Sequence, residues 1–135
     1  MSLAGYIGCM KEIPLSGDGS EDLLIIGPCF SSPAELRNVK ECQFSTPYVY
    51  EVSSDWGIEI SEHTDTAILD DSKMKLSRLC ELMDQYLETG EFFEHYTCWV
   101  GEECDKREGE VTLPLNNFDM DRIRMPEKTL VRFVK

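Results

Sequence analysis

The sequence predicts an α+β fold, in which an antiparallel or mixed β-sheet packs one face against a single long amphipathic helix. The helix is predicted over about residues 73–89, where apolar side chains recur at helical spacing. Short segments rich in β-branched and aromatic residues occupy much of the remaining chain and are typical of strands. No repeat and no long linker divides the 135 residues, so we expect a single domain over residues 1–135.

Two segments near the start of the chain, residues 4–10 and 23–30, have strand character. The polar run 16–22 between them is rich in glycine, serine and aspartate, so we expect the two strands to pair antiparallel. The unbroken apolar run 23–26 predicts that the second strand is central in the sheet and covered on both faces.

A short helix is predicted over about residues 33–41. Ser32 supplies the hydroxyl of an N-cap, Pro33 takes the first helical position, and Glu35 completes a capping box. The start of this helix is therefore defined by local sequence alone.

Alternating aromatic and β-branched residues predict a strand over residues 46–52, and the same period predicts another over 57–61. Residues 53–56 are expected to join them as a hairpin loop. In the first of these strands the alternation places Val49 and Glu51 on the same face.

The predicted long helix follows, with an apolar stripe made of Leu76, Leu79, Cys80, Met83, Tyr86 and Leu87. Asp70, Asp71 and Ser72 are expected to cap its N-terminus, and Gly90 is expected to end it. The remaining strands are predicted over residues 92–100, 110–115 and 130–134.

The charge of the chain limits its partners. It has 13 basic and 26 acidic side chains, a net charge of -13, which disfavours direct binding to nucleic acid and to anionic membranes. No apolar run approaches the ~20 residues that a membrane-spanning helix needs. The N-terminus has no basic segment followed by an apolar one, as a secretory signal has, so we expect a cytoplasmic protein.

The six cysteines are scattered and form no C-x-x-C pair, so we expect reduced and mostly buried thiols. Cys9 and Cys29 are weak candidates for a redox bridge across the first strand pair. We expect no bound cofactor.

The acidic residues are concentrated. From residue 41 to residue 72 there is no lysine or arginine, and this stretch contains Glu41, Glu51, Asp55, Glu59, Glu62, Asp65, Asp70 and Asp71. A run of one sign predicts a continuous negative surface, although a coat that only confers solubility would have the same pattern. The first hypothesis is a protein-binding module, resembling an inhibitor or immunity protein in its action, for a basic partner. Its expected contact residues are Glu51, Asp55, Trp56, Glu59 and Glu62.

The C-terminal stretch has the opposite charge, with Arg122, Arg124, Lys128, Arg132 and Lys135 against a single glutamate, Glu127. These bases could pair with the acidic stretch inside one molecule or between two, which makes a homodimer plausible.

A second hypothesis is a thiol- or metal-dependent enzyme built on His95, Cys98 and Cys104, because imidazole and thiolate are the usual ligands of zinc. A strand would place His95 and Cys98 on opposite faces, which argues against shared coordination, so we assign no metal site and no catalytic residue. A third alternative is a structural or small-ligand-binding domain with a pocket between sheet and helix.

Overall fold

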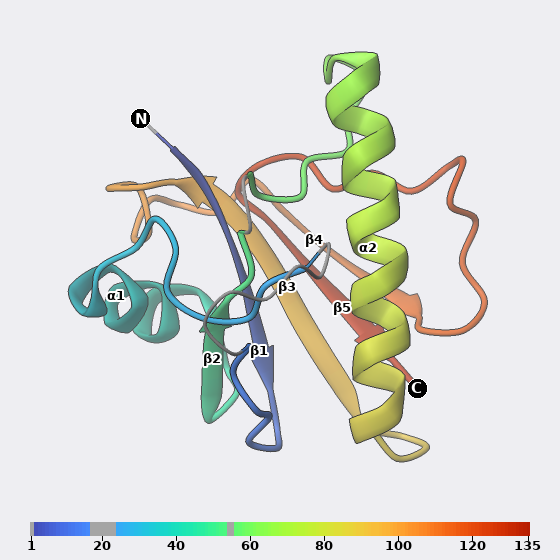
Figure 1. Cartoon of the computed structure of the whole chain (residues 1–135), viewed down its shortest axis with the longest axis horizontal. Coiled ribbons are helices and arrows are strands. Elements are labelled where there is room, and N and C mark those ends of the chain that lie inside the picture. The colour runs from blue at the N-terminus through green and yellow to red at the C-terminus, as the bar shows by residue number, and fades with distance from the viewer. Residues whose placement is uncertain (1, 17–23, 54–55) are drawn as a thin grey trace.

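The computed structural model describes residues 2–16, 24–53 and 56–135, and it confirms the predicted α+β class (Figure 1). A five-stranded mixed sheet has the strand order β2-β1-β3-β5-β4. The strands are β1 (Leu3–Cys9), β2 (Tyr48–Glu51), β3 (Phe92–Trp99), β4 (Gly109–Pro114) and β5 (Thr129–Val134), and the helices are α1 (Pro33–Gln43) and α2 (Thr66–Tyr86).

All neighbouring strands run antiparallel except β4 and β5, which are parallel. The pairing of β1 with β3 brings Tyr6 opposite Tyr96, and all seven residues of β1 are buried. Burial of both faces explains why β1 shows no alternation of apolar and polar residues.

The helices cover opposite faces of the sheet. On one face, Leu79 and Met83 of α2 belong to the same core as Ile7, Phe93 and Phe133. On the other face, Val39 of α1 packs in a smaller core that contains Tyr6, Tyr96 and Leu130. Figure 1 shows α1 beside β1 and β2, at the opposite end of the sheet from β4.

The long helix begins at Thr66, well before the predicted start at residue 73. Asp65 is its N-cap, and its carboxylate accepts a hydrogen bond from the Ala67 N–H at 3.0 Å. The prediction that Asp70, Asp71 and Ser72 cap the helix is therefore wrong, because these residues lie inside it. No helix in the described part of the chain is both long enough and apolar enough to cross a membrane.

Two predicted strands do not form. Within the described part of residues 23–30 there is no strand, and 57–61 contributes only an isolated bridge between Ile60 and Met125. Residue 23 and most of the polar run before it lie outside the described residues.

The cysteines also differ from the prediction. Cys42 at the end of α1 forms a disulfide with Cys104 in the loop between β3 and β4, with their Cα atoms 5.3 Å apart. The two residues are 62 positions apart in sequence, so only the folded chain brings them together. Cys9 and Cys29 do not form the predicted redox bridge with each other, and Cys29 is exposed.

Candidate functional site

Glu51, predicted as a contact residue, lies in the protein interior with an exposed fraction of 1%. Its carboxylate accepts hydrogen bonds from the N–H groups of Cys29 (2.8 Å), Phe30 (2.9 Å) and Ser31 (3.0 Å). The hydroxyls of Ser31 and Ser53 donate to it as well. Glu51 thus anchors the segment that leads into α1, and the prediction that it contacts a partner is wrong.

The environment of Glu51 explains how a charged group is stable there. Burial alone would raise the pKa of the Glu51 carboxyl, but hydrogen bonds from Ser31, Ser53 and the nearby backbone N–H groups hold it below its ordinary value. A carboxylate that accepts this many hydrogen bonds stabilises the fold in its ionised form.

Trp56 is partly buried, and its ring packs edge-on against Trp99 with centroids 5.7 Å apart. Its backbone carbonyl also accepts a hydrogen bond from the Lys75 ammonium at 3.2 Å. These contacts give Trp56 a packing role between the loop, α2 and β3. Asp55 lies outside the described residues.

The other two predicted contact residues lie just before α2. Glu62 is exposed, whereas Glu59 is partly buried and accepts a hydrogen bond from the Thr64 hydroxyl at 3.2 Å. They therefore sit near the N-terminal end of α2.

This end of α2 projects beyond the sheet (Figure 1). Ile68 lies on the same face of the helix as Ser72 and Leu79, which are buried, yet Ile68 is 39% exposed. The face that packs on the sheet along most of α2 therefore continues past the core without a covering layer.

Acidic residues surround this apolar side chain in sequence. We define the helix-tip surface as Glu62, Asp65, Ile68 and Asp70, all of which are exposed. Asp71 is excluded because its carboxylate forms an ion pair with the buried Lys75 ammonium at 2.9 Å. Sequence reasoning counted the acids of this surface but missed Ile68, which lies outside the predicted helix.

The structure does not bring His95, Cys98 and Cys104 together. His95 and Cys98 point to opposite faces of β3, as the alternation predicts, and Cys104 is bonded to Cys42. Among the described residues, no three histidine, cysteine or acidic side chains are placed to hold a metal ion.

Burial also makes the remaining groups poor catalysts. It lowers the pKa of the His95 imidazole to about 3 and raises the pKa of the Cys98 thiol to about 12. The Cys9 thiol has its pKa raised to about 11 by burial. Near neutral pH these groups are uncharged, so they supply neither a thiolate nucleophile nor an imidazolium acid.

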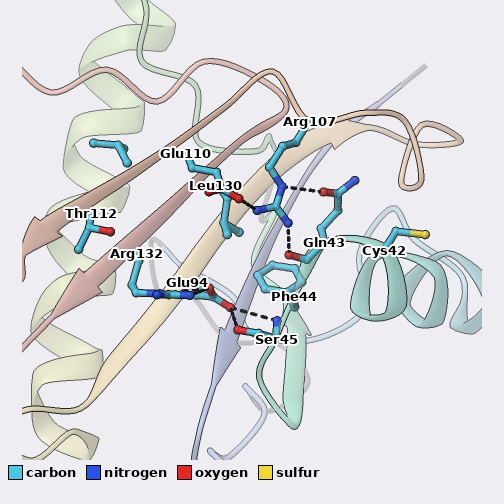
Figure 2. Close-up of a pocket in the computed structure, with 11 residues that line it drawn as sticks. Cys42, Gln43, Phe44, Ser45, Glu94, Arg107, Glu110, Thr112, Leu130 and Arg132 are labelled. Carbon is cyan, nitrogen blue, oxygen red and sulfur yellow. Dashed lines mark hydrogen bonds and ion pairs between the residues drawn. The ribbon is translucent and has the colours of Figure 1, made fainter.

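A polar cleft of about 220 Å³ lies on the α1 face of the sheet, where β5 and β4 extend past the helix (Figure 2). On its floor the buried Glu94 carboxylate accepts hydrogen bonds from the Arg132 guanidinium at 2.8 Å and the Ser45 hydroxyl at 3.1 Å. The Ser45 N–H adds a third donor at 3.3 Å. Figure 2 shows these groups converging on the carboxylate.

A second cluster closes the upper part of the cleft. The Arg107 guanidinium donates to the Gln43 carbonyl at 2.7 Å and to its side-chain oxygen at 3.2 Å, and it pairs with Glu110. Every charged group around this cleft therefore has a partner of opposite charge or a hydrogen bond (Figure 2). Such an arrangement orders the cleft but leaves no free base or nucleophile in it.

The basic tail forms ion pairs inside the molecule, and those found between described residues do not involve the acidic stretch. Arg132 pairs with Glu94, and the Lys135 ammonium lies 3.1 Å from the Asp84 carboxylate. Lys128 pairs with Asp105 at 3.1 Å. These described pairs leave the helix-tip surface without a basic partner from the tail.

Comparisons of the chain with protein-family models, with curated proteins and with solved structures find no match. Its function is therefore argued from the geometry of the described residues.

Proposed function

We propose that this protein is a binding module whose helix-tip surface docks onto a basic protein, acting by steering and blockage as an inhibitor or immunity protein does. The observation that carries the proposal is the exposure of Ile68 on the face of α2 that is elsewhere buried. An exposed apolar side chain at a helix end that also has exposed acidic residues has the composition of a recognition surface rather than of a solubility coat.

The charge of the molecule supports the same proposal. A net charge of -13 attracts a basic partner over long distances and accelerates its encounter. At contact, Glu62 and Asp70 would pair with lysine or arginine side chains of the partner, and Ile68 would enter an apolar depression on it. The net charge of the whole molecule would attract the partner, and the helix-tip surface would determine where the partner docks.

The disulfide bears on the compartment in which the protein meets such a partner. The sequence predicts a cytoplasmic location, whereas the disulfide between Cys42 and Cys104 favours an oxidising compartment, because reducing systems keep most cytosolic thiols unpaired. We propose that the protein functions in an oxidising compartment, where this disulfide is stable.

The experiment immobilises the wild type and three variants, exposes each to the same native extract and elutes it with a salt gradient. The test variant is Glu62→Lys with Asp70→Lys, and the control is Glu41→Lys with Glu81→Lys, which are exposed away from the tip. Reversing two acids changes the net charge from -13 to -9 in both variants (-13 + 4 = -9), so they differ only in the location of the change.

We expect a basic protein to be retained by the wild type and by the control, and to be lost from the test variant. Ile68→Ala should reduce the amount of the basic protein that is retained at low salt. The salt concentration at which the retained protein elutes should stay the same. Equal loss from both double variants would show that only net charge matters, and the helix-tip surface would be excluded.

A further inference from the structure

The two edges of the sheet differ in how they are covered. Along β2, the Gly27 N–H donates to the Glu51 carbonyl at 2.9 Å, so part of this edge is occupied by the chain itself. At the other edge, β4 pairs only with β5 among the described strands. Glu110, Val111 and Thr112 in the middle of β4 are all exposed. An uncovered edge strand is a template for pairing with another strand.

The hydrogen-bonding groups that β4 offers can be read from its pairing with β5. The Leu115 N–H donates to the Val134 carbonyl at 2.8 Å, so the odd-numbered residues of β4 direct their N–H and C=O groups toward β5. The even-numbered residues, Glu110, Thr112 and Pro114, direct theirs outward. The free edge therefore presents two N–H groups and three carbonyls, since proline lacks the donor.

From this pattern we infer that β4 pairs antiparallel with β4 of a second copy of this chain, about a two-fold axis between the two Thr112 residues. In this register Thr112 exchanges two hydrogen bonds with the partner's Thr112. The Glu110 N–H donates to the carbonyl of the partner's Pro114. By symmetry, the N–H of the partner's Glu110 donates to the Pro114 carbonyl. The missing proline N–H removes one bond at each end and leaves the central pair intact.

The side chains fit the same register. Val111, a large apolar residue with 36% exposure, comes to lie opposite the partner's Leu113 on the α2 face. Glu110 is the only charged residue of β4, and it lies opposite the partner's Pro114 rather than another acid. Its charge is also compensated by Arg107 in its own chain. No like charges therefore oppose each other across this pairing.

The proposed dimer also determines how the polar clefts of the two copies are arranged. Glu110 and Thr112 line the cleft, and a two-fold axis perpendicular to the sheet keeps both clefts on the same face. The two clefts would then flank the seam, with Thr112 of each chain between them. Because pairing of two short strands buries far less than the ~1,200 Å² of a standard interface, the dimer should be weak and concentration-dependent.

The test uses the mass of the protein in solution, measured by sedimentation equilibrium over a wide concentration range. The wild type should move from 15.5 kDa toward twice that mass as concentration rises. Thr112→Lys and Thr112→Glu each place two like charges opposite each other at the axis, so each variant alone should remain a monomer. An equimolar mixture of the two should dimerise again, because lysine now faces glutamate.

Thr89→Lys and Thr89→Glu are matched controls, because Thr89 is exposed outside the sheet. Both should dimerise as the wild type does. A wild type that stays monomeric at every concentration overturns the inference. A dimer that is unaffected by both Thr112 variants overturns it too, since it would form through another surface. Circular dichroism of the Thr112 variants checks that they fold.

Discussion

The guanidinium of Arg132 lies 2.8 Å from the carboxylate of Glu94, and this ion pair joins β5 to β3 on the floor of the polar cleft. The Glu94 side chain is 1% exposed and the Arg132 side chain 40% exposed. Arg132 therefore brings to the interior the positive charge that a buried carboxylate needs, while part of its own side chain stays in contact with solvent.

We expect Arg132→Ala to lower the free energy of unfolding by about 2 kcal/mol, because Glu94 would keep only its hydrogen bonds from Ser45. Urea denaturation at neutral pH measures the change. Arg122→Ala is the control, since Arg122 lies 3.6 Å from Asp119 with 88% of its side chain exposed. It should shift stability by no more than about 0.5 kcal/mol. Equal losses in the two variants would contradict the role given to Glu94.

The disulfide is expected to stabilise the fold mainly by restricting the unfolded chain. For a loop of 62 residues the chain-entropy model gives about 4 kcal/mol, and measured values are often smaller. Replacing both Cys42 and Cys104 by serine should therefore lower the free energy of unfolding by about 2–4 kcal/mol in urea. Cys29→Ser, at an exposed cysteine outside this disulfide, should change the free energy of unfolding much less. Alkylation of all six cysteines in unreduced, denatured protein would rule the disulfide out.

The anchor role of Glu51 predicts a dependence of stability on pH. Its pKa is lowered in the folded protein, so the stabilisation is present above the unfolded value and is lost as pH falls through the folded one. Glu51→Gln should therefore cost about 2 kcal/mol at neutral pH, and its difference from the wild type should shrink in acid. Urea denaturation at neutral and acidic pH gives both values. Glu62→Gln, at an exposed site, should show neither effect, and a pH-independent loss in Glu51→Gln would contradict the anchor role.

The class of fold could be predicted because its signals are local. The apolar stripe around Leu79 and the N-cap at Ser32 act within one or two helical turns, and the structure confirms both helices. The start of α2 was missed because Thr66 to Asp71 lie at the projecting end of the helix, where Leu69 packs against the core but the neighbouring residues make no continuous apolar stripe. The Asp65 cap begins the helix there.

The candidate site could be predicted less well, because it depends on contacts that are distant in sequence. A prediction from a run of acidic residues assumes that each acid is exposed. Only the approach of residues 29–31 to β2 shows that Glu51 is buried. In the same way, Cys42 and Cys104 meet only because α1 packs beside the loop that follows β3. Neither pairing has a spacing signal in the sequence.

The buried imidazole of His95 gives a second prediction about pH. Here burial favours the neutral form of the side chain, whereas Glu51 is stabilised in its ionised form. Burial lowers its pKa to about 3, so the folded protein keeps it neutral while the unfolded chain takes up a proton below about 6.5. Its contribution to stability should fall as pH drops through that range, by up to about 1.4 kcal/mol per pH unit. In proton NMR the His95 ring signals should stay constant from pH 8 to about 4.5. A His63→Ala variant assigns them, and titration of His95 near neutrality would show that it is not buried.

The projecting end of α2 predicts that binding and stability can be separated along one helix face. Ile68 is 39% exposed and Leu79 is fully buried, although both lie on this face. Leu79→Ala should lower the free energy of unfolding by about 3 kcal/mol, whereas Ile68→Ala should change it by no more than about 0.5 kcal/mol. Urea denaturation compares the two variants, and amide hydrogen exchange should show faster opening in the first turns of α2 than around Leu79. A large loss of stability in Ile68→Ala would mean that this side chain is part of the core, and the helix-tip surface would lose its apolar anchor.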